Sequence, residues 1–255
     1  MIKRMKKILS LVASVFVFFF HTSLFADDIQ KSAYWGLNYY NYEEQNGGHD
    51  PFMQERTKFL PSLLLGYRDF NGINSKDSRG FSYFIEGTIG QVEYSQYTGV
   101  GTHTHNYWKV QTEGYYPIVS NFYLGLGYRH LYDYLSDYGT GGYDRRNEMW
   151  YLPIGHVLNL KDNSNFRFQF NYLIQGTQTS YLSNVYGAGT DLENKQNKGY
   201  GLDLSYIPSS NNSEWFIRYW DIGDSTTNTV SNSSYTVTGM EPKNQTLEIG
   251  FKSSF

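Results

Sequence analysis

The sequence contains no cysteine, and Ala, Leu, Glu and Lys form no long helix-favouring runs. Without cysteine the chain cannot be a disulfide scaffold and has no thiolate metal site. Beyond residue 26 it also has no apolar run of the roughly 20 residues that a membrane-spanning helix needs, and its densest aliphatic cluster there is Leu63–Leu65. These absences leave two classes for the rest of the chain, a soluble protein or a membrane β-barrel.

Positive charge is also scarce. The formal net charge is -3, and four of the 21 basic residues lie within the first 26 residues. Without that segment, 17 basic residues face 24 acidic ones. Proteins that bind nucleic acid normally carry a basic face or stripe, so this balance predicts no nucleic-acid partner.

Aromatic residues and glycine are abundant, with 25 Tyr, 17 Phe and 25 Gly against six Pro. Aromatic side chains favour pleated strands over helices, and glycine favours turns. The composition of this 255-residue chain therefore predicts one repetitive β domain.

Residues 1–26 have the organisation of a signal peptide. A basic start is followed by an apolar run from Ile8 to Phe20 and then by small and polar residues that end at Ala26. The apolar run is too short for a membrane anchor, so we predict export and cleavage after Ala26. The predicted organisation is a signal peptide, 1–26, and one domain, 27–255.

The rest of the chain divides into segments of about ten residues in which apolar and polar side chains alternate, as in tilted membrane strands that face lipid on one side. In the clearest segment, Phe166, Phe168 and Phe170 alternate with Arg167 and Gln169. A helix would distribute these residues around its circumference, so the pattern predicts a strand. The ten predicted strands are 32–42, 58–69, 81–94, 106–116, 122–129, 148–158, 166–172, 199–207, 214–222 and 245–255.

The connections between these segments alternate between long and short, which is typical of a barrel with loops on one side and tight turns on the other. The pattern predicts an all-β fold: an antiparallel transmembrane up-and-down β-barrel of about ten strands, with eight or twelve as alternatives. A soluble β-sandwich would not need so many Tyr and Trp near its strand ends. The predicted loops are 43–57, 95–105, 134–147, 177–198 and 223–244, and the predicted turns are 70–80, 117–121, 160–165 and 208–213.

The last ten residues resemble a known family. Leu247, Ile249, Phe251 and Phe255 lie on one face of the last predicted strand, and the sequence given stops at that phenylalanine. In this the chain resembles bacterial outer-membrane β-barrel proteins of the small OmpA/OmpX-like class, whose last strand alternates in this way and ends in an aromatic residue read by the barrel-assembly machinery. Ser253 departs from the apolar residue usual at its position.

The resemblance implies a location and partners rather than an activity. The implied location is the outer membrane of a Gram-negative cell, with the long loops outside. The implied partners are outer-membrane lipid and lipopolysaccharide, and, during biogenesis, the barrel-assembly machinery and periplasmic chaperones. An extracellular ligand is a further expectation, because loop tyrosines set among Gly and Asn have the composition of adaptable binding surfaces, although they could equally pack the barrel mouth. These tyrosines are Tyr97, Tyr138, Tyr143, Tyr181 and Tyr186.

Charged residues of both signs fall on the inward faces of the predicted strands. In a lumen too narrow for bulk water, opposed charges must pair. We therefore expect a polar core that fills the barrel, because barrels near eight strands are filled by side chains, and a narrow porin-like channel for small solutes is the alternative. The predicted lumen charge network comprises Arg68, Glu86, Lys109, Glu113, Arg129, Arg167, Asp203, Arg218 and Glu248, with Lys252 on the same face.

His103 and His105, two residues apart, are weak candidates for metal ligands. Two imidazoles need a third ligand, and nothing in the sequence brings His49 or Asp50 to them. We interpret them as solvent-exposed loop histidines and expect no metal and no cofactor.

Two catalytic alternatives remain minor. An omptin-like surface protease also uses ten strands and places acidic residues and a histidine at its external rim, but the Asp-x-Asp and Asp-x-His pairing of that family has no match here. A lipid hydrolase would need a His–Ser pair on one outward strand face, and none stands out. The sequence predicts a structural or surface-interaction role without catalysis, followed by a narrow channel and then by a rim-site hydrolase. The aspartates near external strand ends are Asp133, Asp137, Asp144, Asp221 and Asp224.

Overall fold

The computed structural model describes residues 31–46, 48–74, 80–97, 102–119, 121–138, 142–209 and 212–255. The predicted signal peptide and its cleavage after Ala26 lie outside these residues. Among the described residues, no helix has the length and hydropathy that crossing a membrane would require. The strands are β1 (Lys31–Asn46), β2 (His49–Arg56), β3 (Ser62–Asp69), β4 (Ser82–Gln96), β5 (His103–Val119), β6 (Phe122–Asp133), β7 (Arg145–Asn159), β8 (Asn165–Ser180), β9 (Leu192–Gln196), β10 (Gly199–Ile207), β11 (Ser213–Ile222), β12 (Asn228–Ser231), β13 (Thr236–Gly239) and β14 (Lys243–Ser254).

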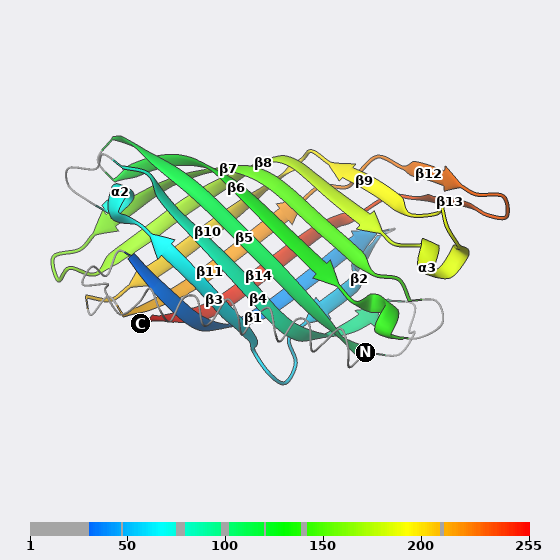
Figure 1. The fold of residues 1–255 in the computed structure, drawn as a ribbon, viewed down its shortest axis with the longest axis horizontal. Coiled ribbons are helices and arrows are strands. Elements are labelled where there is room, and N and C mark those ends of the chain that lie inside the picture. The colour runs from blue at the N-terminus through cyan, green and yellow to red at the C-terminus, as the bar shows by residue number, and fades with distance from the viewer. Residues whose placement is uncertain are drawn as a thin grey trace.

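Three short helical segments accompany the strands: α2 (Asn71–Asn74), η2 (Leu135–Tyr138) and α3 (Ser183–Tyr186). Antiparallel pairing runs around a closed cylinder (Figure 1), in which β10 pairs with β8 and β14 pairs with β1. Strands β2 and β3 occupy one position between β1 and β4. The predicted antiparallel barrel of ten strand positions is therefore confirmed.

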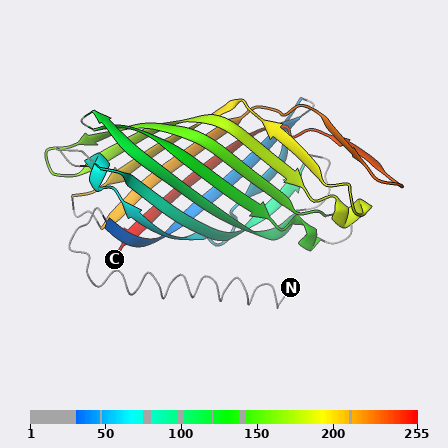
Figure 2. The same cartoon turned by 45° about the horizontal axis from the view of Figure 1, so that its top comes forward.

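The two ends of the barrel differ. The start of β1, the C-terminus, α2 and the short connections lie at one end, which we call the turn end (Figure 2). At the opposite end, the loop end, β9, α3 and the hairpin of β12 and β13 extend beyond the barrel wall. This polarity is the one that the alternating connection lengths predict.

The outer surface carries a continuous apolar band because the alternation of each strand is kept in register with its neighbours. Each residue of one such row lies opposite the next in the strand pairing, and each is 36–47% exposed. The inward neighbours Arg167 and Gln169 are buried. Large apolar groups thus face outward and polar groups inward, as in a barrel immersed in lipid. The row consists of Phe168, Leu204, Ile217, Ile249 and Tyr39.

Glycine makes room inside the narrow barrel at Gly127 and Gly155. A Cβ at Gly127 would come within 2.3 Å of the Tyr151 ring, and one at Gly155 within 2.1 Å of the Tyr123 ring. Both tyrosines are fully buried. These two glycines are therefore the places where neighbouring aromatic rings cross the lumen.

The second strand position departs from the prediction of one strand at 58–69 after a loop at 43–57. β3 begins at Ser62, and β2 lies where the loop was expected, paired with β1 from Asn41↔Arg56 to Asn46↔His49. Residues 57–61 interrupt the wall, with Phe59 79% and Leu60 77% exposed. The prediction was wrong here because Gly48, with a φ of 82°, supports a tight hairpin between β1 and β2. The alternation of long and short connections had suggested one long loop at this place.

Two other predicted loops contain regular structure. Within 177–198, β8 continues to Ser180, and α3 and β9 follow. Within 223–244, β12 and β13 form a separate two-stranded sheet. The alternation of apolar and polar side chains did not indicate these strands, because a strand beyond the membrane has no face in contact with lipid and need not alternate.

The apolar band makes a direct prediction for Phe170, which lies five residues from the turn end of β8 and 41% exposed. Phe170→Arg should lower the free energy of unfolding in lipid vesicles by about 2–4 kcal/mol, because it places a charge near the middle of the bilayer. Gln175→Arg, which lies farther along the same strand and nearer the edge of the apolar band, should lower the free energy of unfolding by only about 0–1 kcal/mol. Urea titration of the refolded barrel measures both, and equal losses at the two positions would contradict the placement of the band.

Candidate functional site

The lumen is crossed by buried ion pairs that join strands far apart in the sequence. Glu86 of β4 binds Arg218 of β11, with 2.6 Å between Oε1 and Nη1, and Lys252 of β14, with 2.8 Å between Oε2 and Nζ. The Tyr34 hydroxyl donates to Oε2 at 3.1 Å. All four residues are at most 4% exposed. One carboxylate therefore ties β4, β11 and β14 together across the barrel.

A second shared carboxylate is Glu248 of β14. It pairs with Lys109 of β5 and with Arg129 of β6, whose Nη2 is 3.4 Å from Oε1. The side-chain amide of Asn38 donates to Oε2 at 2.9 Å. These four residues are each 1% exposed. The charges are thus removed from water and depend on one another for compensation.

The third shared carboxylate, Glu214 of β11, lies nearer the turn end. It pairs with Arg68 of β3 and with Arg167 of β8, whose Nη2 is 3.1 Å from Oε1. The Arg167 guanidinium lies over the Phe70 ring at 4.6 Å from the centroid. Buried apolar side chains cover these pairs toward the turn end: Phe70, Ile73, Phe84, Tyr115, Tyr123 and Val157.

Glu113 is held by neutral donors instead of cations. It accepts hydrogen bonds from the hydroxyls of Tyr151 (2.7 Å) and Tyr115 (2.5 Å). The amides of Gln111 and Gln169 each donate to it at 2.8 Å. Four donors satisfy a buried carboxylate without a salt bridge.

All ten predicted lumen residues lie inside the barrel, and Asp203, half-buried, accepts from the Gln169 amide at 3.3 Å. The structure joins two predicted acids, Glu86 and Glu248, to predicted bases. Arg68 and Arg167 instead meet at Glu214, which the prediction missed. The sequence could have indicated that Glu214 faces inward. It lies four residues before the inward Arg218 on the same strand, and residues an even number apart on a strand share one face.

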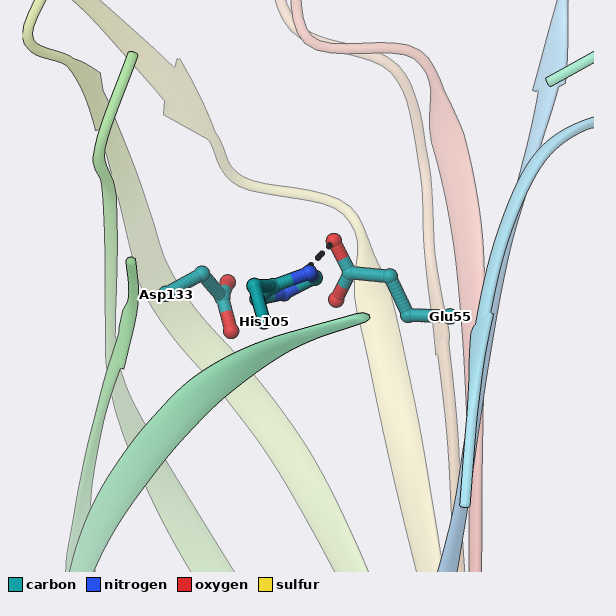
Figure 3. Close-up of side chains that lie close together, drawn as sticks. All are labelled: Glu55, His105 and Asp133. Carbon is teal, nitrogen blue, oxygen red and sulfur yellow. Dashed lines mark ion pairs between the residues drawn. The ribbon is translucent and has the colours of Figure 1, made fainter. Parts of the chain in front are cut away.

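A histidine and two carboxylates form a separate cluster toward the loop end (Figure 3). His105 lies between Glu55 of β2 and Asp133 of β6, and its Nε2 is 3.7 Å from Glu55 Oε1. One ligand-type atom from each of the three residues lies within 4.8 Å of the others. Their exposed fractions are 0–1%. The interpretation of His105 as a solvent-exposed loop histidine was therefore wrong, because β5 begins at His103 and carries it into the lumen.

Arg145, the first residue of β7, holds several of the acids beside this cluster. It contacts Glu55 through Nη2 at 2.5 Å and Glu44 through Nη1 at 2.7 Å. The Tyr42 hydroxyl oxygen lies within hydrogen-bond distance of both Glu44 Oε1 (2.9 Å) and Glu241 Oε1 (3.0 Å). Burial raises the pKa of Glu241, which lies in the connection before β14, to about 8.

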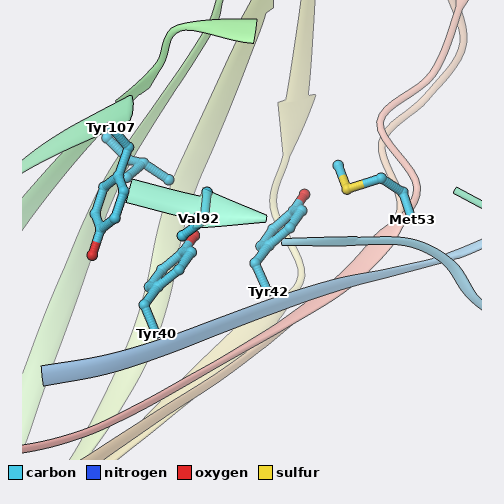
Figure 4. Close-up of a cluster of buried hydrophobic side chains, with 6 residues drawn as sticks. Tyr40, Tyr42, Met53, Val92 and Tyr107 are labelled. Atoms are coloured by element: carbon cyan, nitrogen blue, oxygen red, sulfur yellow. The ribbon is translucent and has the colours of Figure 1, made fainter. Parts of the chain in front are cut away.

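Apolar and aromatic side chains line the lumen around the cluster (Figure 4). The Tyr40 and Tyr107 rings stack with centroids 5.0 Å apart, and Tyr107 donates to the Ser62 hydroxyl at 2.7 Å. This packing keeps the histidine and its carboxylates apart from bulk water. The members are Tyr40, Tyr42, Met53, Val92, Tyr107 and Leu131.

The cluster lies beyond the apolar band. His105 is fourteen residues from the turn end of β5. At about 3.3 Å per residue and a tilt near 40°, this corresponds to roughly 35 Å along the barrel axis, against an apolar band about 25 Å tall. The sequence did not predict the cluster because Glu44, Glu55 and Arg145 fell in expected loops, and only closure of the barrel brings β2, β5, β6 and β7 together.

The remaining predicted site residues have defined positions. His103 is half-buried, with its ring 6.0 Å from that of His105. The carboxylate of Asp144 accepts from the Ser136 amide and the Tyr132 hydroxyl, so it organises a loop. Asp221 pairs with Lys243, and Asp224 is exposed. The side chains of Asp137, Tyr138, His49 and Asp50 lie outside the described residues.

The assembly-signal residues on β14 face outward. Phe251 packs against Trp215 with ring centroids 4.8 Å apart, and the Phe255 amide donates to the Ala33 carbonyl at 3.1 Å. Ile249 and Phe255 are 46% and 42% exposed, and Leu247 is half-buried. Their role in assembly stays a prediction.

The loop tyrosines divide into two groups. Tyr181 packs near Tyr132, with centroids 5.9 Å apart, and Tyr143 is half-buried. Tyr97 and Tyr186 are 57% and 39% exposed. Packing at the barrel mouth therefore applies to part of the set, and a binding role for the exposed tyrosines stays a prediction.

No model of a known protein family matches the chain, and no curated protein matches it in sequence. Several solved structures are similar to it over most of its length. The outer membrane protease OmpT from Escherichia coli has 12% identity and a TM-score of 0.47, covering 88% of this chain and 96% of its own. The β domain of the Bordetella autotransporter BrkA has 14% identity and a TM-score of 0.43, covering 88% and 99%.

The Pseudomonas putida toluene transporter TodX has 10% identity and a TM-score of 0.32, covering 91% of this chain and 90% of its own. A protease, an autotransporter domain and a transporter share only the barrel architecture at these identities, so the likeness assigns no activity. The closed antiparallel barrel with an apolar outer face, described above, is the architecture that the resemblance of the last strand implied.

The shared carboxylates predict a large cost for removing one of them. Glu214→Gln leaves Arg68 and Arg167 buried without their counterion and should lower the free energy of unfolding by about 3–5 kcal/mol. The matched change Glu193→Gln, in an exposed pair with Lys195, should change it by less than about 1 kcal/mol. Urea unfolding in lipid vesicles compares the two, and a similar small loss for both would show that the lumen pairs do not hold the barrel.

Proposed function

We propose that this outer-membrane barrel is sealed and non-catalytic, and that it has a structural or surface-interaction role exercised by its loop end. The observation that carries this proposal is the sharing of Glu86, Glu214 and Glu248, each between two bases from different strands. A conducting path along the axis would have to pass through these groups. Breaking buried pairs of this kind is costly, which favours a closed lumen over a narrow channel.

One small cavity lies beside the Glu248 group. It has a volume of about 20 Å³ and lies among Arg129, Met149, Gln196 and Thr246, among others. That volume holds about one water molecule. At this place in the lumen, the packing supports a filled interior rather than a water column.

The burial of His105 also favours a role without catalysis. A general base must come within hydrogen-bond reach of the proton that it removes from a substrate. His105, Glu55 and Asp133 are at most 1% exposed, and Arg145 occupies one oxygen of Glu55. A rim-site hydrolase would need these groups open to a peptide or a lipid.

The surface proposed for interaction is an ordered platform formed by α3, β9, β12 and β13. The Asn232 side chain donates to the carbonyls of Tyr186 and Ala188, and it accepts from the amides of Ser234 and Tyr235. The exposed rings of Tyr186 and Tyr235 lie 5.5 Å apart, centroid to centroid. Paired tyrosines on a rigid support supply contact area at low entropic cost.

Single-channel recording in planar bilayers tests the seal. The refolded barrel should give no discrete current steps. Removing one complete group with Glu86→Ser, Arg218→Ser and Lys252→Ser, which leaves none of these three charges unpaired, should produce steps. The paired control, Glu193→Ser with Lys195→Ser, alters an exposed ion pair and should stay silent. Reproducible steps from the unmodified barrel would reject the sealed barrel in favour of the channel.

Replacing residues 227–239 by a short Gly-Ser linker tests whether the platform serves the barrel itself. β12 and β13 form a sheet separate from the barrel, and the side-chain bonds of Asn228 and Asn232 to the neighbouring segments are exposed. The free energy of unfolding should therefore change by about 0.5 kcal/mol or less, as for most surface changes. Urea unfolding measures it. A loss of several kcal/mol would mean that the hairpin supports the fold and is not maintained for display.

A further inference from the structure

We propose that Glu55, His105 and Asp133 form a binding site for a divalent transition-metal ion, of which Zn²⁺ is the best match. The site would join β2, β5 and β6 inside the loop end of the barrel. This goes beyond the sealed-barrel proposal, which requires no metal.

The spacing of the three side chains suits one ion. Ligand atoms around a tetrahedral zinc at bond lengths of about 2.0–2.1 Å are roughly 3.3 Å apart. His105 Nε2 and Glu55 Oε1 are 3.7 Å apart, and the full set lies within 4.8 Å. Side-chain rotations that bring these atoms about 0.4 to 1.5 Å closer would complete three protein ligands, and a water molecule would supply the fourth.

A second observation points to a cation independently of the spacing. Both carboxylate oxygens of Asp133 are buried and accept no hydrogen bond, and the same holds for Glu55 Oε2. Arg145 Nη2 is 3.7 Å from Asp133 Oδ2, too far for a hydrogen bond. Buried carboxylate oxygens normally have partners, so these oxygens, beside an imidazole, are suited to coordinating an ion.

The charge balance at the loop end is the third argument. Three buried carboxylates, Glu44, Glu55 and Asp133, lie around the guanidinium of Arg145. A fourth buried acid, Glu241, reaches Glu44 through the Tyr42 hydroxyl. The middle of the lumen is different, since the bases there outnumber the acids. A divalent cation would offset the negative charge of these acids at the loop end.

The ligand types decide which ion fits. An imidazole with two carboxylates suits Zn²⁺ and, with lower affinity, Mn²⁺. Ca²⁺ takes six to eight oxygen ligands, which this cluster does not offer. The expected order of affinity is Zn²⁺ above Mn²⁺ above Ca²⁺.

The test is titration of the refolded, chelator-treated barrel in detergent with ZnCl₂, using isothermal calorimetry and competition with a chromophoric chelator. One Zn²⁺ should bind per chain. His105→Gln and Asp133→Asn should each weaken binding at least about 100-fold, since loss of a ligand should cost no less than loss of a supporting contact. Heat-modifiable migration on a gel confirms that each variant is folded.

His130→Gln is the matched control. His130 also lies beside a carboxylate, with Nδ1 3.5 Å from Glu148 Oε1, but in a partly exposed pair elsewhere in the barrel wall. This change should leave the affinity for Zn²⁺ unaltered. Zn²⁺ should also raise the thermal unfolding midpoint of the unmodified barrel and of His130→Gln, and should not raise that of His105→Gln.

Three results would overturn the proposal: no stoichiometric Zn²⁺ binding by the folded barrel, undiminished binding by His105→Gln, or tighter binding of Ca²⁺ than of Zn²⁺. None of these results bears on conductance, so the sealed barrel and the metal site stand or fall separately. If His105→Gln does not fold, Asp133→Asn and the Co²⁺ absorption spectrum of the unmodified barrel decide the matter. Absence of the ligand-field bands of nitrogen- and oxygen-bound Co²⁺ would count against the site.

Discussion

The structure depends on one constraint: charges placed inside a narrow barrel cannot keep their water and must find partners on other strands. Glu86, Glu214 and Glu248 meet it by each binding two bases. Such pairs do not guarantee high stability, because apolar residues of similar volume at the same positions can give an equally stable fold. They do penalise a shifted register, since a slip of one residue would turn these side chains toward lipid.

The same period-two geometry that turns charges inward builds the outer surface. Phe168 and Phe170 face outward because Arg167 and Gln169 face inward, and the neighbouring strands continue both sets. Apart from the interruption at residues 57–61, closure leaves no free edge among the described strands of the barrel, which satisfies the backbone where lipid offers no hydrogen bonds. Interior and exterior are therefore two results of one alternating pattern.

That pattern also explains how far the sequence could be interpreted. Alternation identified ten strands and the inward charges, because lipid imposes it locally on every strand. It did not indicate that Glu214 is the partner of Arg68 and Arg167, since pairing depends on closure between strands distant in the chain. It failed for Glu55 and Arg145, which lie beyond the lipid, where no apolar face marks a strand. The interruption at 57–61 was hidden for a related reason: Phe59 and Leu60 continue an apolar run although their backbone leaves the ladder.

The length of the strands sets how far the folded wall extends beyond the apolar layer. β1 and β8 each have 16 residues, which at about 3.3 Å per residue and a tilt near 40° gives a wall roughly 40 Å tall. An apolar layer about 25 Å thick leaves some 15 Å of folded wall above it. The exposed rings of Tyr186 and Tyr235 lie on the segments that extend still farther from the turn end, so under the proposed function a partner would reach them without displacing lipid.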